Sequence, residues 1–327
     1  MKKIDSIAVF TSGGDSPGMN ACIRAVVRTG LFNGFSVYGI HHGYNGMISG
    51  EIEKMEASSV ANIIQRGGTI LKTARSNAFL TPEGRATAYE NLKKHNIDAI
   101  VAIGGDGTFT GASVFMEEHP DISIVGCPGT IDNDLSGTDF TIGFDTAINT
   151  VIDAVDKIRD TAASHDRLFF IEVMGRDSGL IALHTGIGAG SEAILIPETK
   201  TYVDRLIEKL ERGNRRQKTS HIVIVAEGDD SGGAYKLADL VKEKFPQFDI
   251  RVSVLGHVQR GGNPSCADRV LASRLGYEAV EALSRGRKGI MIGQVNGEIV
   301  YTPFENAVRD EDKMNMQLVK MAEILSL

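Results

Sequence analysis

Cysteine, long apolar runs and an excess of positive charge are what this sequence lacks. Its three cysteines, Cys22, Cys127 and Cys266, are scattered and odd in number, which excludes a disulfide framework and fits a reducing compartment. No apolar run reaches about 18 residues, and the stretch after the N-terminal lysines is too short for a signal peptide. The formal net charge of -7 argues against nucleic-acid binding, which needs a basic surface. We therefore expect a soluble, cytoplasmic protein that holds any anionic ligand with local arginines.

Glycine, by contrast, is abundant, and short β-branched runs alternate with helical patterns along the 327 residues. The runs that we expect to form buried strands are 6–10, 36–40, 98–103, 122–127, 168–174, 193–197, 221–227, 250–256 and 289–295. Helical spacing of apolar residues covers 144–163 and 202–212, and Gly213 supplies a stop for the second. The alternation predicts an α/β fold with two doubly wound domains, mainly parallel sheets and a boundary near residue 140.

Four glycine-rich or acidic segments follow expected strands: "TSGGDSPGMN", "GGDGTFTG", "PGTIDND" and "HVQRGG". In doubly wound sheets, ligands bind beyond the carboxyl ends of the strands. Glycine lets the backbone approach a phosphate, and the N-terminus of a following helix offers N–H groups to an anion. The P-loop pattern is nevertheless absent, and G-x-G-x-x-G fails because Thr110 follows Gly105 and Gly107 where a glycine is needed.

The residues in these segments suit phosphoryl transfer, which needs a metal-holding carboxylate, cations and a base. Asp106 is a candidate Mg²⁺ ligand, Asp132 a candidate base, and Asp134 its orienting or metal-linked neighbour. The arginines that could clamp phosphates are Arg75, Arg167, Arg176, Arg251 and Arg260. From the residues alone, "GGDGT" can also be a strand-to-helix turn, and "TIDND" an Asx-turn loop.

The order of the motifs resembles one known family, the bacterial 6-phosphofructokinases, in its short form. The shared motifs are "TSGGDSPGMN", "RGGT" with "TAR" (67–75), "IGGDGT", "PGTIDND", "DT" with "SHDR" (160–167), "EVMGR" and "GHVQRGG". "GGDGT" alone also occurs in lipid and NAD kinases, whereas "PGTIDND" with "MGR" and "GH-x-QRGG" is specific. The resemblance extends nearly end to end.

The resemblance implies transfer of a phosphoryl group from MgATP to fructose 6-phosphate in glycolysis, by a homotetramer. It implies an ATP- and Mg²⁺-binding domain over 1–141, to which 257–306 returns, and a sugar-phosphate-binding domain over 142–256 with 307–327. Asp132 would take the proton from the C1 hydroxyl with Thr130 and Asp134 beside it, Asp106 would bind the metal, and Arg75 and Arg176 would face the moving phosphoryl group. The nucleotide-binding residues implied are Gly14, Arg75, Ser76, Gly105, Asp106, Gly107 and Thr108. The substrate-binding residues implied are Thr130, Asp132, Arg167, Met174, Gly175, Arg176, Glu227, Arg251, His257 and Arg260, of which Arg167 and Arg251 would serve a neighbouring subunit.

An effector site is a separate expectation. Arg24 and Arg28 lie four residues apart on one helical face, which read alone is typical of a solvated surface. The resemblance implies that they bind an anionic effector, ADP or phosphoenolpyruvate, together with Arg159, Glu192 and Lys218. Where well-studied members have an arginine, a tyrosine and an aspartate, this chain has Ala57, Ser58 and Asn62.

Two alternatives to the ATP-dependent enzyme stay open at this point: a pyrophosphate-dependent member, and a catalytically silent subunit that binds sugar phosphate for regulation. The resemblance associates pyrophosphate use with an aspartate at the position of Gly107 and a lysine at that of Gly129. The two glycines in this chain therefore favour ATP, and the full set Asp106, Asp132 and Arg176 argues against a silent copy.

Overall fold

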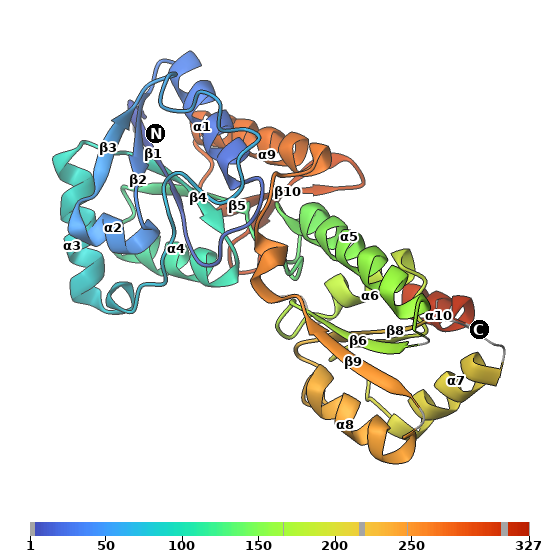
Figure 1. Cartoon of the computed structure of the whole chain (residues 1–327). Helices are drawn as coiled ribbons and strands as arrows, with labels where there is room; N and C mark the ends of the chain where they lie inside the picture. Colours follow the sequence, from blue (N-terminus) through green and yellow to red (C-terminus); the bar gives the residue numbers. More distant parts are fainter. Residues whose placement is uncertain (1–3, 166, 216–219, 247, 309–312, 327) are drawn as a thin grey trace. The chain divides into compact units, whose positions relative to one another are not determined.

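A computed structural model describes residues 4–165, 167–215, 220–246, 248–308 and 313–326, and the chain divides into two compact units (Figure 1). The first unit comprises Met1–Ile131, Leu135–Thr146 and Arg260–Asp310. The second comprises Asp132–Asp134, Ala147–Gln259 and Glu311–Leu327. Across the described ranges, no helix has both the length and the apolar character that crossing a membrane requires.

The first unit is built on a seven-stranded sheet in the order β11-β10-β5-β4-β1-β2-β3. Its strands are β1 (Ser6–Thr11), β2 (Ser36–Ile40), β3 (Ile52–Met55), β4 (Ala99–Gly104), β5 (Ser123–Pro128), β10 (Ile290–Val295) and β11 (Glu298–Pro303). The five central strands are parallel. The helices of this unit are α1 (Met19–Phe32), α2 (Gly43–Ser49), α3 (Pro82–Lys94), α4 (Asp106–Glu118) and α9 (Cys266–Ser284), with a 3-10 turn at Ala78–Leu80.

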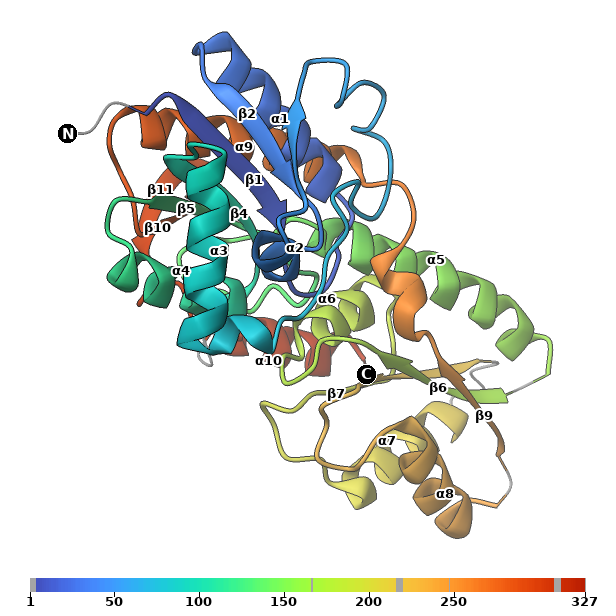
Figure 2. The same ribbon diagram turned by 90° about the vertical axis from the view of Figure 1, so that its left-hand side faces the viewer.

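Each face of this sheet is covered by helices because successive side chains of a strand point to opposite sides. In β1, Ile7 and Val9 pack with α1 and α9, whereas Ala8 and Phe10 pack with α2, α3 and α4. Figure 2 shows α3 and α4 on the side of the sheet opposite to α9. Burial on both faces explains why the parallel strands are continuous apolar runs in the sequence.

Both outermost strands of this sheet are antiparallel additions that the sequence patterns did not predict. β3 pairs antiparallel with β2, and β11 pairs antiparallel with β10. The turn between β10 and β11 is Asn296-Gly297, with φ of 50° and 83°, as a two-residue type I′ hairpin turn requires. β3 and β11 were missed because both carry charged or half-exposed residues, as edge strands commonly do.

The second unit has a four-stranded, fully parallel sheet in the order β7-β8-β6-β9. Its strands are β6 (Arg167–Val173), β7 (Ala193–Leu195), β8 (His221–Ala226) and β9 (Asp249–Val254). Its helices are α5 (Phe144–Ala163, mostly in this unit), α6 (Leu180–Gly188), α7 (Val203–Arg215), α8 (Ala234–Lys244) and α10 (Met316–Leu325), and a 3-10 turn spans Gly256–Arg260. Helices α7 and α8 cover one face of the sheet, and Figure 1 places α5 and α6 on the other. The predicted fold class, doubly wound α/β with mainly parallel sheets, is thus confirmed.

Two local predictions in the second unit were wrong. The strand expected at 250–256 is not buried, because β9 is the edge strand of its sheet and its side chains are exposed or half-exposed. Helix α7 does not stop at Gly213 but continues to Arg215. A Cβ at Gly213 would lie 3.1 Å from Glu192 Oε1 and 3.2 Å from His221 Cε1, so this glycine permits close packing of α7 on a buried pair.

Candidate active site

Three of the glycine-rich segments follow β1, β4 and β5, which are adjacent parallel strands of the first unit. The loops after β1 and β4 contact each other, because the Thr108 hydroxyl donates a hydrogen bond to the Ser12 carbonyl oxygen at 3.4 Å. A Cβ at Gly104 would lie 2.3 Å from Thr108 Oγ1 and 2.7 Å from the Ser12 oxygen, so this contact requires glycine. The segments after β1 and β4 thus lie side by side at the carboxyl ends of adjacent strands.

The segment "GGDGT" forms the start of α4. Gly105 is its N-cap, and Asp106 lies exposed in the first turn. Gly107 is also exposed, and nothing lies within 4 Å of the position that its Cβ would take. Thr108 is buried and its backbone N–H donates to the Gly105 oxygen at 3.0 Å. The helix N-terminus, a carboxylate and open space next to a glycine thus occur together.

Other nucleotide-site candidates of the first unit lie in loops. A Cβ at Gly14 would lie 2.6 Å from Arg260 Nη1, and the same nitrogen donates to the Asp15 carbonyl oxygen at 3.0 Å, so the Arg260 guanidinium lies directly against the loop after β1. Arg75 is exposed, and the Asn45 amide donates to its carbonyl oxygen at 3.1 Å. Ser76 accepts a hydrogen bond from the Phe79 N–H at 3.2 Å.

The "TIDND" loop divides between the two units. Thr130 belongs to the first, where the Thr141 hydroxyl donates to its carbonyl oxygen at 2.6 Å. Asp132 belongs to the second and is 4% exposed. Its Oδ2 lies 4.0 Å from Arg176 Nε, and the Ser178 hydroxyl donates to its carbonyl oxygen at 3.2 Å. A nearly buried carboxylate is thus paired with a half-exposed guanidinium.

Met174, Gly175 and Arg176 form a tight turn after β6. Gly175 has φ of 143°, and Arg176 has φ of 53°, a left-handed conformation that is uncommon for residues other than glycine. The backbone N–H groups of Gly175 and Arg176 both donate to Glu227 Oε1, at 3.2 and 2.7 Å. The Met174 N–H donates to Gln259 Oε1 at 3.3 Å. The strained turn is therefore held by two side chains from distant segments.

Arg167 and Arg251 lie on neighbouring strands and share one carboxylate. Arg167 Nε donates to Asp249 Oδ2 at 2.7 Å, and Arg251 forms a salt bridge with Asp249 Oδ1. The hydrogen bond from Arg167 and the charge of Arg251 hold the pKa of the Asp249 carboxyl below its usual range. The two arginines predicted to serve a neighbouring subunit thus flank one carboxylate, Arg167 from the inner strand β6 and Arg251 from the edge strand β9. His257 is exposed in the turn that follows β9.

The effector candidates occupy both units. Arg24 is half-buried and Arg28 exposed on α1, whereas the Arg159 guanidinium donates to the Ala189 carbonyl oxygen. Glu192 is 5% exposed, and its Oε2 lies 2.7 Å from His221 Nδ1, also buried. Lys218 lies outside the described residues.

The substitutions relative to the family pattern are all at the surface or in a turn. Ala57, Ser58 and Asn62 are exposed, and Asn62 has φ of 54°.

Asp134, next to the proposed base, is half-buried. In the part of the chain that the structure describes, no group of three or more His, Cys, Asp and Glu side chains has metal-binding geometry.

The sequence profile described as "Phosphofructokinase" matches residues 6–283. The chain belongs to this family. It is 54% identical to ATP-dependent 6-phosphofructokinase 2 of Bacteroides thetaiotaomicron over 327 residues, which covers 100% of both chains. It is 56% identical to ATP-dependent 6-phosphofructokinase 1 of Thermus thermophilus over 321 residues, 98% of this chain and 99% of the relative.

Solved structures agree with this assignment. Phosphofructokinase from Saccharomyces cerevisiae matches with a TM-score of 0.89 and 38% identity. The match covers 99% of this chain but 48% of the yeast chain, so this chain spans about half the length of that relative. Pyrophosphate-dependent phosphofructokinase from Marinobacter aquaeolei, with a TM-score of 0.85 over 95% of this chain and 86% of its own, shares the fold at 22% identity.

Three residues that position the candidate site were not predicted from the sequence: Ser178, Asp249 and Gln259. Each acts through a polar contact between segments that are distant along the chain. Gln259 is fully buried and is part of the family motif "GHVQRGG". Its place in that motif was the signal that could have identified it. Asp249 and Ser178 carried no such signal.

Proposed function

We propose that this phosphofructokinase family member transfers the γ-phosphoryl group of ATP to the C1 hydroxyl of fructose 6-phosphate, giving fructose 1,6-bisphosphate and ADP. Full-length similarity to relatives named ATP-dependent 6-phosphofructokinase supports the reaction. The observation that carries the proposal is the Asp132–Arg176 pair, a shielded carboxylate with a cation at 4.0 Å. Phosphoryl transfer requires the protein to accept the proton of the attacking hydroxyl and to stabilise the negative charge on the transferred group.

The proposed chemistry assigns Asp132 as the base that accepts the C1 hydroxyl proton. Its backbone is held by Ser178, which limits the positions that the carboxylate can sample. Arg176 and Arg75 stabilise the negative charge on the moving phosphoryl group, since a planar guanidinium matches phosphate oxygens. Thr130 and Asp134 flank the base in the chain and orient the hydroxyl.

Nucleotide binding is proposed for the loops of the first unit, with Gly14, Ser76, Gly105, Gly107 and Thr108 beside the phosphates. The amide groups at the start of α4 suit an anion. Asp106 fits Mg²⁺, which needs one or two carboxylates and takes its other ligands from phosphate oxygens and waters, and the space beside Gly107 leaves room for such a group. Bound there, the ion would neutralise charge on the transferred phosphate.

Sugar-phosphate binding is proposed for the turn Met174–Arg176 with Glu227, His257 and Arg260. Glu227 holds the turn and keeps its second carboxylate oxygen for a sugar hydroxyl. Arg167 and Arg251 are proposed to bind the 6-phosphate of a neighbouring subunit's substrate in a homotetramer. Their convergence on Asp249 supports a shared role, and Arg251 lies exposed on the edge strand β9.

A regulatory anion site is proposed around Arg24, Arg28, Arg159 and Glu192. Replacing both Arg24 and Arg28 by alanine should abolish the response to ADP or phosphoenolpyruvate and leave maximal turnover unchanged. Initial rates at subsaturating fructose 6-phosphate, with and without each effector, measure this. An unchanged effector response in the double variant would mean that the two arginines only form a solvated face of α1 and bind no effector.

The test of the proposed function is turnover of fructose 6-phosphate by the purified chain, with ATP or pyrophosphate as the donor. Product is followed by coupled oxidation of NADH after cleavage of fructose 1,6-bisphosphate. We expect turnover with ATP and negligible turnover with pyrophosphate. Efficient use of pyrophosphate would identify the pyrophosphate-dependent alternative, and binding of fructose 6-phosphate without turnover would identify the silent regulatory subunit.

The two glycines that bear on the donor have different surroundings. Gly129 is buried, and a Cβ there would lie 3.0 Å from both Ile103 Cγ2 and Met19 Cε, so a lysine does not fit without movement of its neighbours. Gly107 faces open space. These surroundings support a site that keeps room for a nucleotide and offers no substitute cation for pyrophosphate.

A further inference from the structure

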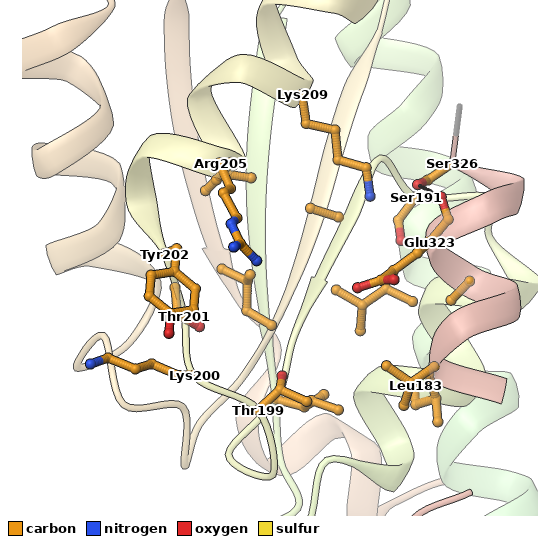
Figure 3. Close-up of a pocket in the computed structure, with 17 residues that line it drawn as sticks. Leu183, Ser191, Thr199, Lys200, Thr201, Tyr202, Arg205, Lys209, Glu323 and Ser326 are labelled. Carbon is orange, nitrogen blue, oxygen red and sulfur yellow. Dashed lines mark hydrogen bonds between the residues drawn. The ribbon is translucent and has the colours of Figure 1, made fainter. Parts of the chain in front are cut away.

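A cavity of about 510 Å³ lies in the second unit and shares no residue with the candidate active site or the proposed effector site. Its volume lies within the roughly 300–1,000 Å³ typical of small-molecule sites. It is formed by α6, β7, the segment after β7, α7 and α10 (Figure 3). Its lining combines apolar, aromatic and charged side chains, among them Ile196, Tyr202, Arg205, Leu206, Lys209 and Glu323.

One wall of the cavity is the inner face of α10. Val319, Ala322, Glu323 and Ser326 line the cavity and recur at helical spacing, so they share one face of the helix. In an ordinary surface helix such a face is packed against the core. No residue of α10 is buried, and this face borders a space that protein atoms do not fill.

The opposite wall is apolar at its base. Ile196 and Leu206 are buried, at 2% and 4% exposure, and Leu195 is half-buried beside them. Together with Val319 on α10 they provide hydrocarbon surface on two sides of the cavity. A ligand that enters this space removes apolar surface from water.

Positive charge lies above this apolar base. Arg205 and Lys209 are one turn apart on α7, and Figure 3 shows both side chains extending toward the space in front of α10. Arg205 Cζ lies 4.8 Å from the centroid of the Tyr202 ring, a cation–π contact, and within the described ranges Arg205 forms no salt bridge. Arg212, two turns further along the same helix, does not line the cavity and forms a salt bridge with Glu208 at 3.7 Å.

We propose that this cavity binds a small organic monocarboxylate with an unbranched apolar body, such as a medium-chain fatty acid. The Arg205 guanidinium receives the carboxylate, and the hydrocarbon lies between Leu206 and Val319. Glu323 extends into the same space from α10, as Figure 3 shows, and its charge disfavours a phosphate dianion. The inference does not rest on the proposed reaction.

The sequence contains no tryptophan, so Tyr202→Trp places a single indole at the cavity and keeps an aromatic ring beside Arg205. Titration of the full-length variant with octanoate, below its micelle concentration, should change the emission saturably. Ligand-observed NMR with the unmodified protein should detect the same binding. Lengthening the chain from hexanoate to octanoate should tighten binding by up to about fourfold per methylene.

In the same background, Arg205→Ala should weaken octanoate binding by roughly 10- to 100-fold, because it removes a charged hydrogen-bond donor. Arg212→Ala, the matched control at an arginine of α7 that does not line the cavity, should leave binding unchanged. Ala322→Phe should fill the cavity and abolish binding, with the thermal unfolding transition showing that the variant is folded. Glu323→Gln should tighten octanoate binding.

Four outcomes would each overturn the proposal: no saturable change with octanoate, equal affinity in the Arg205→Ala variant, equal affinity for 1-octanol, or tighter binding of octyl phosphate. Equal affinity for 1-octanol would mean that the cavity recognises only the hydrocarbon chain. Tighter binding of octyl phosphate would mean that it selects a phosphate group.

Discussion

Replacing Asp132 by asparagine removes the proposed proton acceptor and keeps the size of the side chain. Asparagine cannot take a proton from the C1 hydroxyl, and a positioned base contributes roughly 10²–10⁴-fold to a rate. This corresponds to about 3–5 kcal/mol of barrier height. We therefore expect kcat to fall by that factor.

The effect on folding should be much smaller, because the arginine that pairs with Asp132 is half-exposed. Arg176 Nε lies 4.0 Å from Oδ2, and the arginine side chain is 53% exposed. A pair screened by solvent in this way contributes about 0–1 kcal/mol. The contact from Ser178 goes to the backbone oxygen and survives the substitution. A folded and nearly inactive enzyme is the expected result.

Steady-state kinetics of the Asp132→Asn variant against fructose 6-phosphate checks this, together with the chemical unfolding midpoint. KM should change little, since an interaction made only in the transition state lowers kcat and kcat/KM equally. Asp153→Asn is the matched control, because Asp153 is 70% exposed on α5 and pairs with Lys157. A kcat of the Asp132→Asn variant within tenfold of the unmodified enzyme would refute the role of Asp132 as base.

Three further predictions follow from the structure. The Gly107→Asp variant should fold normally, because open space surrounds the position and an acidic residue suits the first turn of a helix. It should nevertheless weaken the use of ATP far more than the binding of fructose 6-phosphate. Steady-state kinetics with each substrate varied in turn will show this. Because Arg251 is proposed to serve the site of a neighbouring subunit, mixing inactive Arg251→Ala with inactive Asp132→Asn chains should restore part of the activity. No recovery after verified subunit exchange would count against sites shared between subunits. Glu118 accepts two hydrogen bonds from Arg85, at 2.7 and 2.6 Å, and these lower the pKa of its carboxyl. The pair therefore stabilises the folded protein at pH values above the pKa of Glu118 in the unfolded chain. This stabilisation is lost as the pH falls through the pKa of Glu118 in the folded protein. Glu118→Gln should therefore lower the free energy of unfolding by about 1–2 kcal/mol near neutral pH and by progressively less in acid, as denaturant titrations at several pH values will show.

Most of the fold was predictable because the parallel strands are buried on both faces and so are continuous apolar runs. The expected strand at 98–103 corresponds to β4 (Ala99–Gly104), and the expected helix at 144–163 to α5 with the same bounds. The edges were not predictable in this way, because β3 and β11 contain charged or half-exposed residues. The end of α7 was predicted wrongly for a related reason. Local propensity predicts that a helix stops at Gly213, but this glycine instead allows the helix to pack closely on Glu192 and His221.

The candidate site was predictable in its motifs but not in its contacts. The glycines and aspartates in "GGDGT" and "PGTIDND" indicated phosphate chemistry, and the assignment of individual roles came from the family resemblance. The contacts of Gln259 with Met174 and of Asp249 with Arg167 join segments more than 80 residues apart. No periodicity or local spacing in a single sequence encodes such pairs.

The first unit is discontinuous along the chain, and this affects how the protein folds during synthesis. Its last segment, Arg260–Asp310, carries α9 and β10 and follows the main segment of the second unit. α9 packs into the apolar cluster that also contains α1, and β10 pairs with β5. Domains generally fold in the order in which the ribosome makes them. Here the N-terminal unit cannot close its core until the second unit has emerged. A nascent chain that stops before Arg260 therefore leaves the apolar sides of α1 and β5 exposed to water, which favours aggregation.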